Sequence, residues 1–73
     1  MATAPIMTGR VETFDDPAGL GVVRSDEGRA LPFHCTAIAD GSRTIDEGTV
    51  VTFRVVPGRL GRWEATELRP AQR

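Results

Sequence analysis

His34 and Cys35, the sole histidine and the sole cysteine, carry the most versatile chemistry in the sequence and are direct neighbours. An imidazole can stack on a nucleobase or form hydrogen bonds with it, and a thiolate in electropositive surroundings can act in redox chemistry. A zinc site needs more ligands at wider spacings than one His beside one Cys, so we expect no metal. A small, space-filling role is favoured for Cys35.

The carboxylates occur as neighbouring pairs at Asp15–Asp16, Asp26–Glu27 and Asp46–Glu47. Each pair stands in a segment rich in turn-forming residues, which is typical of a solvated turn. The sequence shows neither a Ser, His and Asp arrangement for nucleophilic catalysis nor a glycine-rich phosphate loop followed by Lys. It therefore gives no support to an enzyme, a cofactor or a small-molecule substrate.

Composition places the chain among small folded domains with little overall attraction for phosphate. Its 73 residues suffice for one domain, and 40% apolar with 26% charged residues is typical of a globular protein. All nine basic residues are Arg, but the net charge of -1 argues against strong non-specific binding of nucleic acid. One cysteine excludes an internal disulfide, and neither a signal segment nor a long apolar span is present. We expect a cytoplasmic protein that does not enter a membrane.

Five segments have the alternation or the β-branched residues of strands. They are residues 9–15, 20–24, 30–35, 49–56 and 62–69, and a long loop at 36–48, with at most one helical or 3₁₀ turn, precedes the fourth. Residues 1–7 and 71–73 are expected to be flexible ends of a single domain at 8–70. Five strands in so short a chain, with one long crossing loop, predict an all-β Greek-key barrel, closed or partly open.

Pro32 and the side-chain alternation refine this prediction. Because Pro32 has no backbone N–H, its strand should lie at a sheet edge at that point. Phe33 has the opposite parity to His34 and should point into the barrel. The predicted core consists of Val11, Val23, Leu31, Phe33, Ile38, Ile45, Val51, Phe53 and Val55.

Over residues 8–69 the chain resembles the bacterial cold-shock domain in four successive segments, G-R-V-E-T-F-D, A-G-L-G-V-V, P-F-H-C-T-A-I and D-G-S-R-T-I-D-E-G-T-V-V-T-F. The resemblance implies a five-stranded OB-type barrel that binds single-stranded RNA or DNA, as an RNA chaperone or a regulator of transcription or translation. It also implies two ribonucleoprotein motifs, here A-G-L-G-V-V and L-P-F-H-C, from which family members project rings that stack on bases.

The nucleic-acid site that the resemblance implies comprises Arg10, Thr13, Phe14, Leu20, Val22, Pro32, His34 and Cys35. Of these positions, Phe14 and His34 keep a ring. A threonine replaces the family's tryptophan, Leu, Val, Pro and Cys replace its phenylalanines, and Ser42 replaces a loop aromatic. Stacking is worth about 1–3 kcal/mol per base, so we expect weaker binding than the family norm. Trp63 is an additional ring on the last strand.

Charged residues depart from the family pattern in the same direction. Arg10 keeps a basic position, whereas Glu12 and Ala18 replace two others and Asp15 replaces an asparagine. Fewer cations near phosphate should lower both the affinity and its salt dependence. A basic patch around the last hairpin could be formed by Arg54, Arg59 and Arg62.

Three interpretations of the outward-facing positions are open. The first is weak binding of single-stranded RNA or DNA. The second is a protein-binding module or a homodimer, because positions that carry rings in the family would form an aliphatic patch here: Leu20, Val22, Pro32 and Cys35. The third is a family copy whose barrel persists after binding has been lost. Gly19 and Gly21 fit all three, because glycines in a strand often serve its curvature alone.

Overall fold

A computed structural model describes residues 5–58 and 61–71. It contains five strands, β1 (Ile6–Asp15), β2 (Leu20–Ser25), β3 (Ala30–His34), β4 (Val50–Pro57) and β5 (Trp63–Pro70), and one short 3₁₀ helix, η1 (Cys35–Ala37). Within those ranges, no helix is long and apolar enough to cross a membrane. Arg59, residues 1–4 of the predicted lead-in and residues 72–73 lie outside the described residues.

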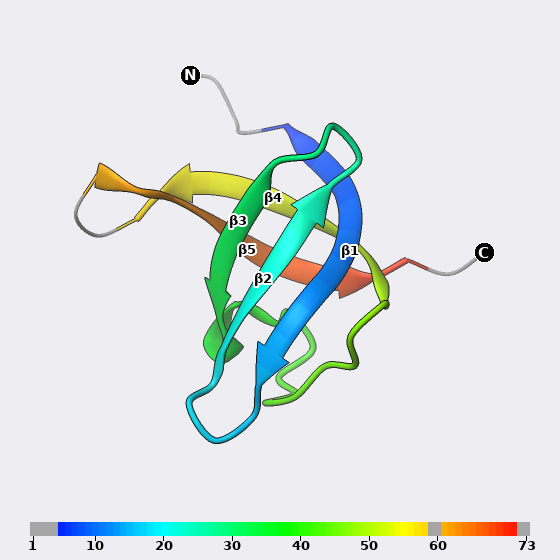
Figure 1. The fold of residues 1–73 in the computed structure, drawn as a ribbon, viewed down its shortest axis with the longest axis vertical. Coiled ribbons are helices and arrows are strands. Elements are labelled where there is room, and N and C mark those ends of the chain that lie inside the picture. Colours follow the sequence, from blue (N-terminus) through cyan, green and yellow to red (C-terminus); the bar gives the residue numbers. More distant parts are fainter. Residues whose placement is uncertain (1–4, 59–60, 72–73) are drawn as a thin grey trace.

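The five strands form one antiparallel sheet with the order β3-β2-β1-β4-β5. The long β1 belongs to both halves of the sheet, because it pairs with β4 along its first part and with β2 from Gly9 onward. The β1-β2-β3 meander crosses over the β4-β5 hairpin (Figure 1), which brings β3 and β5, the two ends of the order, into contact. An isolated parallel bridge joins Ile38 to Leu68 just beyond η1. This arrangement confirms the predicted all-β, five-stranded OB-type Greek-key barrel, with a seam between β3 and β5 that no hydrogen-bonded ladder closes.

The strand boundaries agree closely with the predicted segments, with two differences. β1 begins at Ile6, so Ile6 and Met7 pair with β4 rather than forming part of a flexible lead-in. β3 ends at His34, and Cys35, predicted as its last residue, begins η1 instead. Pro32 stands on an edge strand of the hydrogen-bonded order, as its missing N–H predicts.

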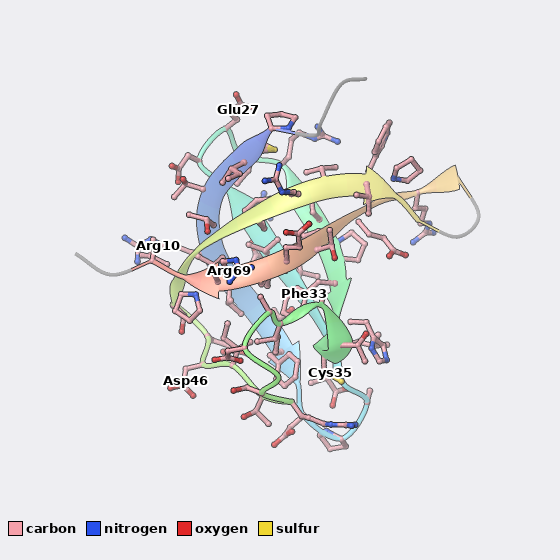
Figure 2. The ribbon with its side chains drawn as sticks, turned by 180° about the vertical axis from the view of Figure 1, so that it is seen from behind. Arg10, Glu27, Phe33, Cys35, Asp46 and Arg69 are labelled. Carbon is pink, nitrogen blue, oxygen red and sulfur yellow. The ribbon has the colours of Figure 1, made fainter. Side chains whose placement is uncertain are left out.

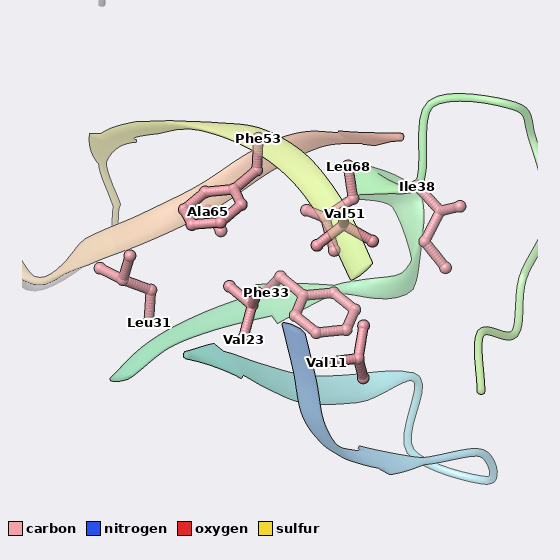
Figure 3. Packing of buried hydrophobic residues seen from close by; sticks show 9 residues of the cluster. All are labelled: Val11, Val23, Leu31, Phe33, Ile38, Val51, Phe53, Ala65 and Leu68. Carbon is pink, nitrogen blue, oxygen red and sulfur yellow. The ribbon is translucent and has the colours of Figure 1, made fainter. Parts of the chain in front are cut away.

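Side chains from both halves of the sheet fill the space between them (Figure 3). The buried hydrophobic residues are Val11, Val23, Leu31, Phe33, Ile38, Val51, Phe53, Ala65 and Leu68. The predicted core is therefore confirmed except at Ile45 and Val55, which are half-buried and pack against it.

A β-bulge in β5 explains why strand alternation does not predict both Ala65 and Leu68 as core residues. The register shifts so that Phe53 of β4 faces two residues of β5, and Glu67 adopts a left-handed φ of 54°. The extra residue lets Ala65 and Leu68, three positions apart, both point inward. Strict alternation would place them on opposite faces.

Candidate nucleic-acid interface

Five of the eight predicted site residues lie together on the outer face of the β1-β2-β3 meander. Across the strands, Thr13 pairs with Val22, which pairs with Pro32, and Leu20 pairs with His34 in the row beside them. Val22 is half-buried and the other four are exposed, Leu20 with 53% of its surface accessible. Pairing places side chains of one row on the same face, so these two adjacent rows form a continuous exposed surface.

Phe14 belongs to the opposite, inward-facing side of the sheet. It pairs with Gly21, which in turn pairs with Phe33. Above this glycine the two rings stack, with centroids 5.9 Å apart and planes inclined by 11°. Phe14 is half-buried and packs against the core, so a large part of its surface is already occupied by Phe33.

Gly21 makes this ring contact possible. A Cβ atom at this position would lie 2.6 Å from the Phe33 ring and 2.7 Å from the carbonyl oxygen of Thr13. Both distances are far below van der Waals contact, so any larger residue would displace the ring or the strand. Gly21 thus serves the packing of the barrel.

Cys35 lies apart from the two outer rows. It begins η1, is half-buried, and its backbone N–H donates to the carbonyl oxygen of Gly19 over 2.8 Å. A Cβ atom on Gly19 would lie 3.0 Å from the Cys35 sulfur. The thiol therefore packs against the β1–β2 turn and lines a different hollow, together with Ile38 and Arg43.

His34 is oriented by the start of η1. Its Nδ1 accepts a hydrogen bond from the backbone N–H of Thr36 over 3.2 Å and lies 3.0 Å from the hydroxyl of the same residue. Since Nδ1 acts as an acceptor, the neutral ring carries its hydrogen on Nε2. The exposed ring is thus held in place with Nε2–H as its available donor.

A groove adjoins the outer face at the seam between β3 and β5. It has a volume of about 460 Å³ and is lined by Leu20, Pro32, Phe33, His34, Thr36 and Glu64. Three of these are predicted site residues. Phe33 was predicted as a core residue, and Thr36 and Glu64 were not predicted. Glu64 reaches the groove only through the packing of β5 beside β3. No local pattern in the sequence signals that packing.

Two basic side chains near the outer face form hydrogen bonds or ion pairs with other groups of the protein. Arg10 is exposed, points away from the sheet (Figure 2), and donates from Nη1 to the carbonyl oxygen of Gly48 over 3.4 Å. Its partner across the strands is Arg24, which is not among the predicted site residues. Arg24 forms an ion pair with Glu12 and donates to the carbonyl oxygen of Gly28 over 2.8 Å.

The Glu12–Arg24 pair perturbs both titrating groups. The hydrogen bond from Arg24 lowers the pKa of the Glu12 carboxyl, and the same contact raises the pKa of Arg24. Both groups are solvent-exposed, so the pair contributes little to stability. The ion pair partly neutralises the charge of the exposed Arg24 side chain.

The predicted basic patch around the last hairpin is only partly formed within the described residues. Arg54 lies 3.6 Å from the carboxylate of Glu67, and Arg62 is exposed. Arg59, the third predicted member, lies outside the described residues. In the ranges that are described, no group of three or more His, Cys, Asp and Glu side chains is placed to hold a metal ion.

The long loop before β4 is fastened to the end of β1. The backbone N–H of Phe14 donates to Glu47 over 3.2 Å. Within the loop, the backbone N–H of Ser42 donates to Asp40 over 2.9 Å, and hydrogen bonds from Ser42 lower the pKa of that carboxyl. The loop is thereby held close to the end of the meander.

Comparison with known proteins agrees with this fold. The 'cold-shock' DNA-binding domain family matches residues 7–71. A cold shock-like protein of Thermotoga maritima is 39% identical over 56 residues, which cover 75% of this chain and 85% of that protein. Cold shock-like protein CspA of Shewanella violacea is 45% identical over 56 residues (74% and 80%). Cold shock protein CspD of Bacillus subtilis is 33% identical over 57 residues (77% and 86%).

The family match spans the five strands, and each of these relatives is covered over most of its length. The chain therefore belongs to the cold-shock domain family of nucleic-acid-binding proteins.

Proposed function

We propose that this chain binds single-stranded RNA or DNA in the cytoplasm through the outer face of β1, β2 and β3, as an RNA chaperone or a regulator of transcription or translation. One observation supports the proposal above the others. Thr13, Leu20, Val22, Pro32 and His34 come from three strands and form two adjacent rows on one exposed face. The groove at the end of these rows adds a recess in which a base can be enclosed.

The same surface favours weak binding. His34 is the single aromatic side chain in the two rows; the row of Leu20 and His34 also holds the exposed carboxylate of Asp15, and the remaining members are aliphatic or hydroxyl-bearing. Each lost stacking ring removes about 1–3 kcal/mol of base contact, which aliphatic side chains replace incompletely. The net charge of -1 and the engagement of Arg24 by Glu12 reduce the electrostatic contribution as well.

Titration with oligonucleotides tests the proposal. Trp63 is 53% exposed on β5, next in sequence to the groove residue Glu64, so its fluorescence reports binding nearby, and calorimetry gives the affinity directly. At low salt we expect pyrimidine-rich or guanine-rich single strands to bind and the matching duplex to bind less. Failure of every single strand to bind would contradict the proposal.

Substitution of His34 locates the binding surface. We expect His34→Ala to weaken binding by about fivefold or more, because one stacking contact is lost. Glu27→Gln is the control, since Glu27 is exposed in the turn between β2 and β3. His34 ends β3 at the other end of that strand, next to Cys35, which lies far from Glu27 (Figure 2). Equal affinities of the two variants would place binding elsewhere on the barrel.

A second candidate function is association with a protein or with another copy of the chain. It is favoured by the exposure of Leu20 beside Val22 and Pro32, which gives the outer face an aliphatic character. Sedimentation across a range of concentrations and pull-down with a Leu20→Asp, Val22→Asp variant test it. A monomer at every concentration, together with partners that the variant retains, would exclude this function for the face.

A further inference from the structure

Glu64 is the one carboxylate among the described residues that line the groove between β3 and β5. Leu20, Pro32 and Phe33 provide apolar surface there, and His34 and Thr36 provide polar groups from the β3 side. The volume of about 460 Å³ lies within the roughly 300–1,000 Å³ of clefts that hold small organic groups. The groove is therefore large enough for a single nucleobase and has an acceptor on its β5 side.

The side chain of Glu64 is held against the backbone of the β4–β5 hairpin. Glu64 is half-buried and pairs with Val56. Its carboxyl group occupies the space that a Cβ atom on Gly58 would fill, so a residue larger than glycine at position 58 would push the carboxyl group away. The absence of a side chain at Gly58 thus leaves the room that the carboxyl group occupies.

Among residues 5–58 and 61–71, neither a hydrogen bond nor an ion pair engages the carboxylate of Glu64. An ionised carboxylate accepts hydrogen bonds and donates none, and it repels phosphate. A nucleic acid that enters the groove must therefore present hydrogen-bond donors to Glu64 and keep its backbone away.

Guanine is the base that meets this requirement best. Its Watson–Crick edge places N1–H and the N2 amino group side by side, so that both can donate to the two oxygens of one carboxylate. Adenine and cytosine each offer one amino group beside an acceptor nitrogen, and thymine and uracil offer one N–H between two carbonyl oxygens. Those acceptors would face the Glu64 oxygens unfavourably.

We infer that the groove is a guanine subsite in which Glu64 accepts hydrogen bonds from N1–H and the N2 amino group of one base in a bound single strand. This inference rests on the proposed function, because it assumes that a single strand lies on the outer face. It adds a base preference to a surface whose other contacts are mainly aliphatic. Glu64 is then the residue that sets specificity, and His34 supplies stacking or the Nε2–H donor from the opposite side.

The test compares strands that differ in one base. The probes are thymine strands about seven nucleotides long, within the length that one OB barrel covers, with guanine, inosine or thymine at the central position. Inosine keeps N1–H and lacks the N2 amino group. It therefore removes one of the two expected hydrogen bonds and keeps the other. We expect the unaltered protein to bind the guanine strand about tenfold more tightly than the inosine strand.

Glu64→Gln and Glu27→Gln form a matched pair of variants, because each removes one negative charge and Glu27 lies outside the groove. We expect Glu64→Gln to reduce the guanine-over-inosine preference to less than about threefold, with unchanged or tighter binding of the all-thymine strand. We expect Glu27→Gln to retain the full preference. Circular dichroism of both variants checks that the barrel is intact.

Two outcomes would overturn the inference while leaving the proposed function in place. In one, the unaltered protein binds the guanine and inosine strands equally. In the other, Glu64→Gln tightens binding to all strands by the same factor, as expected if the carboxylate only repels phosphate. If the unaltered protein bound none of the strands, both the inference and the proposed function would be wrong.

Discussion

The ring of Phe14 stacks on the ring of Phe33 at a centroid distance of 5.9 Å, with Gly21 between them in the sheet. Phe33 is almost fully buried and Phe14 is half-buried. A position that resemblance assigns to the binding surface is thus also part of the packing at the end of the barrel. We therefore expect substitutions of Phe14 to change the stability of the barrel as well as any nucleic-acid binding.

We expect Phe14→Ala to lower the free energy of unfolding by about 2 kcal/mol, less than for a fully buried phenylalanine because the ring is only partly buried. Thr13→Ala is the control, since Thr13 is the exposed neighbour on the outer face, and it should change stability by less than about 0.5 kcal/mol. Urea denaturation measures both. Equal effects of the two substitutions would show that the stacked rings do not stabilise the barrel.

Gly21→Ala should destabilise the protein by about 1–3 kcal/mol, because the added methyl group would overlap the Phe33 ring. A double-mutant cycle with Phe33→Leu isolates this overlap. We expect the double variant to be less destabilised than the sum of the single variants, since leucine leaves room for the methyl group. Strict additivity would mean that the cost of Gly21→Ala arises from the strand backbone rather than from the ring.

Glu12→Gln should strengthen nucleic-acid binding a few-fold, because it releases Arg24 from the ion pair to meet phosphate. The slope of log affinity against log salt should steepen by up to about one unit, as expected for one added phosphate contact. Filter binding at several salt concentrations measures both quantities. A Glu12→Gln, Arg24→Gln variant should lose the gain, and a gain that persists without Arg24 would refute this explanation.

The Glu12 carboxyl should titrate below its ordinary pKa of 4.5, because the Arg24 hydrogen bond favours the ionised form. A carboxyl pKa that is lower in the folded state stabilises folding above the unfolded pKa. That small contribution is lost as the pH falls through the folded pKa. Carbon NMR of the Glu12 carboxyl measures the midpoint, which Arg24→Gln should return toward 4.5. An unchanged midpoint in that variant would rule out Arg24 as the cause.

Strand alternation predicts much of the fold because it reports which face of a strand is buried. It correctly places Phe33 inside and His34 outside, and the missing N–H of Pro32 correctly predicts an edge strand. Alternation fails where a bulge adds a residue. Such shifts in β1 and β5 turn Phe14 and Leu68 inward, and the sequence carries no local sign of either.

The candidate site also has a part that the sequence predicts and a part that it does not. The outer rows follow from the pairing of neighbouring strands, so Leu20, Val22 and His34 could be predicted from resemblance and alternation together. The groove depends on the approach of β5 to β3, two strands that are far apart in the sequence and not joined by a ladder. Glu64 and the engagement of Arg24 by Glu12 therefore appear only in three dimensions.

The most direct test of single-strand binding by the outer face is NMR shift mapping with a thymine strand about seven nucleotides long, within the span of one OB barrel, that contains one guanine. We expect the largest shift changes at Thr13, Leu20, Val22 and His34 and at Glu64 in the groove, with little change at Glu27 at the far end of the meander. Shift changes centred around Glu27, or no changes at saturating strand concentration, would contradict the assignment of this face.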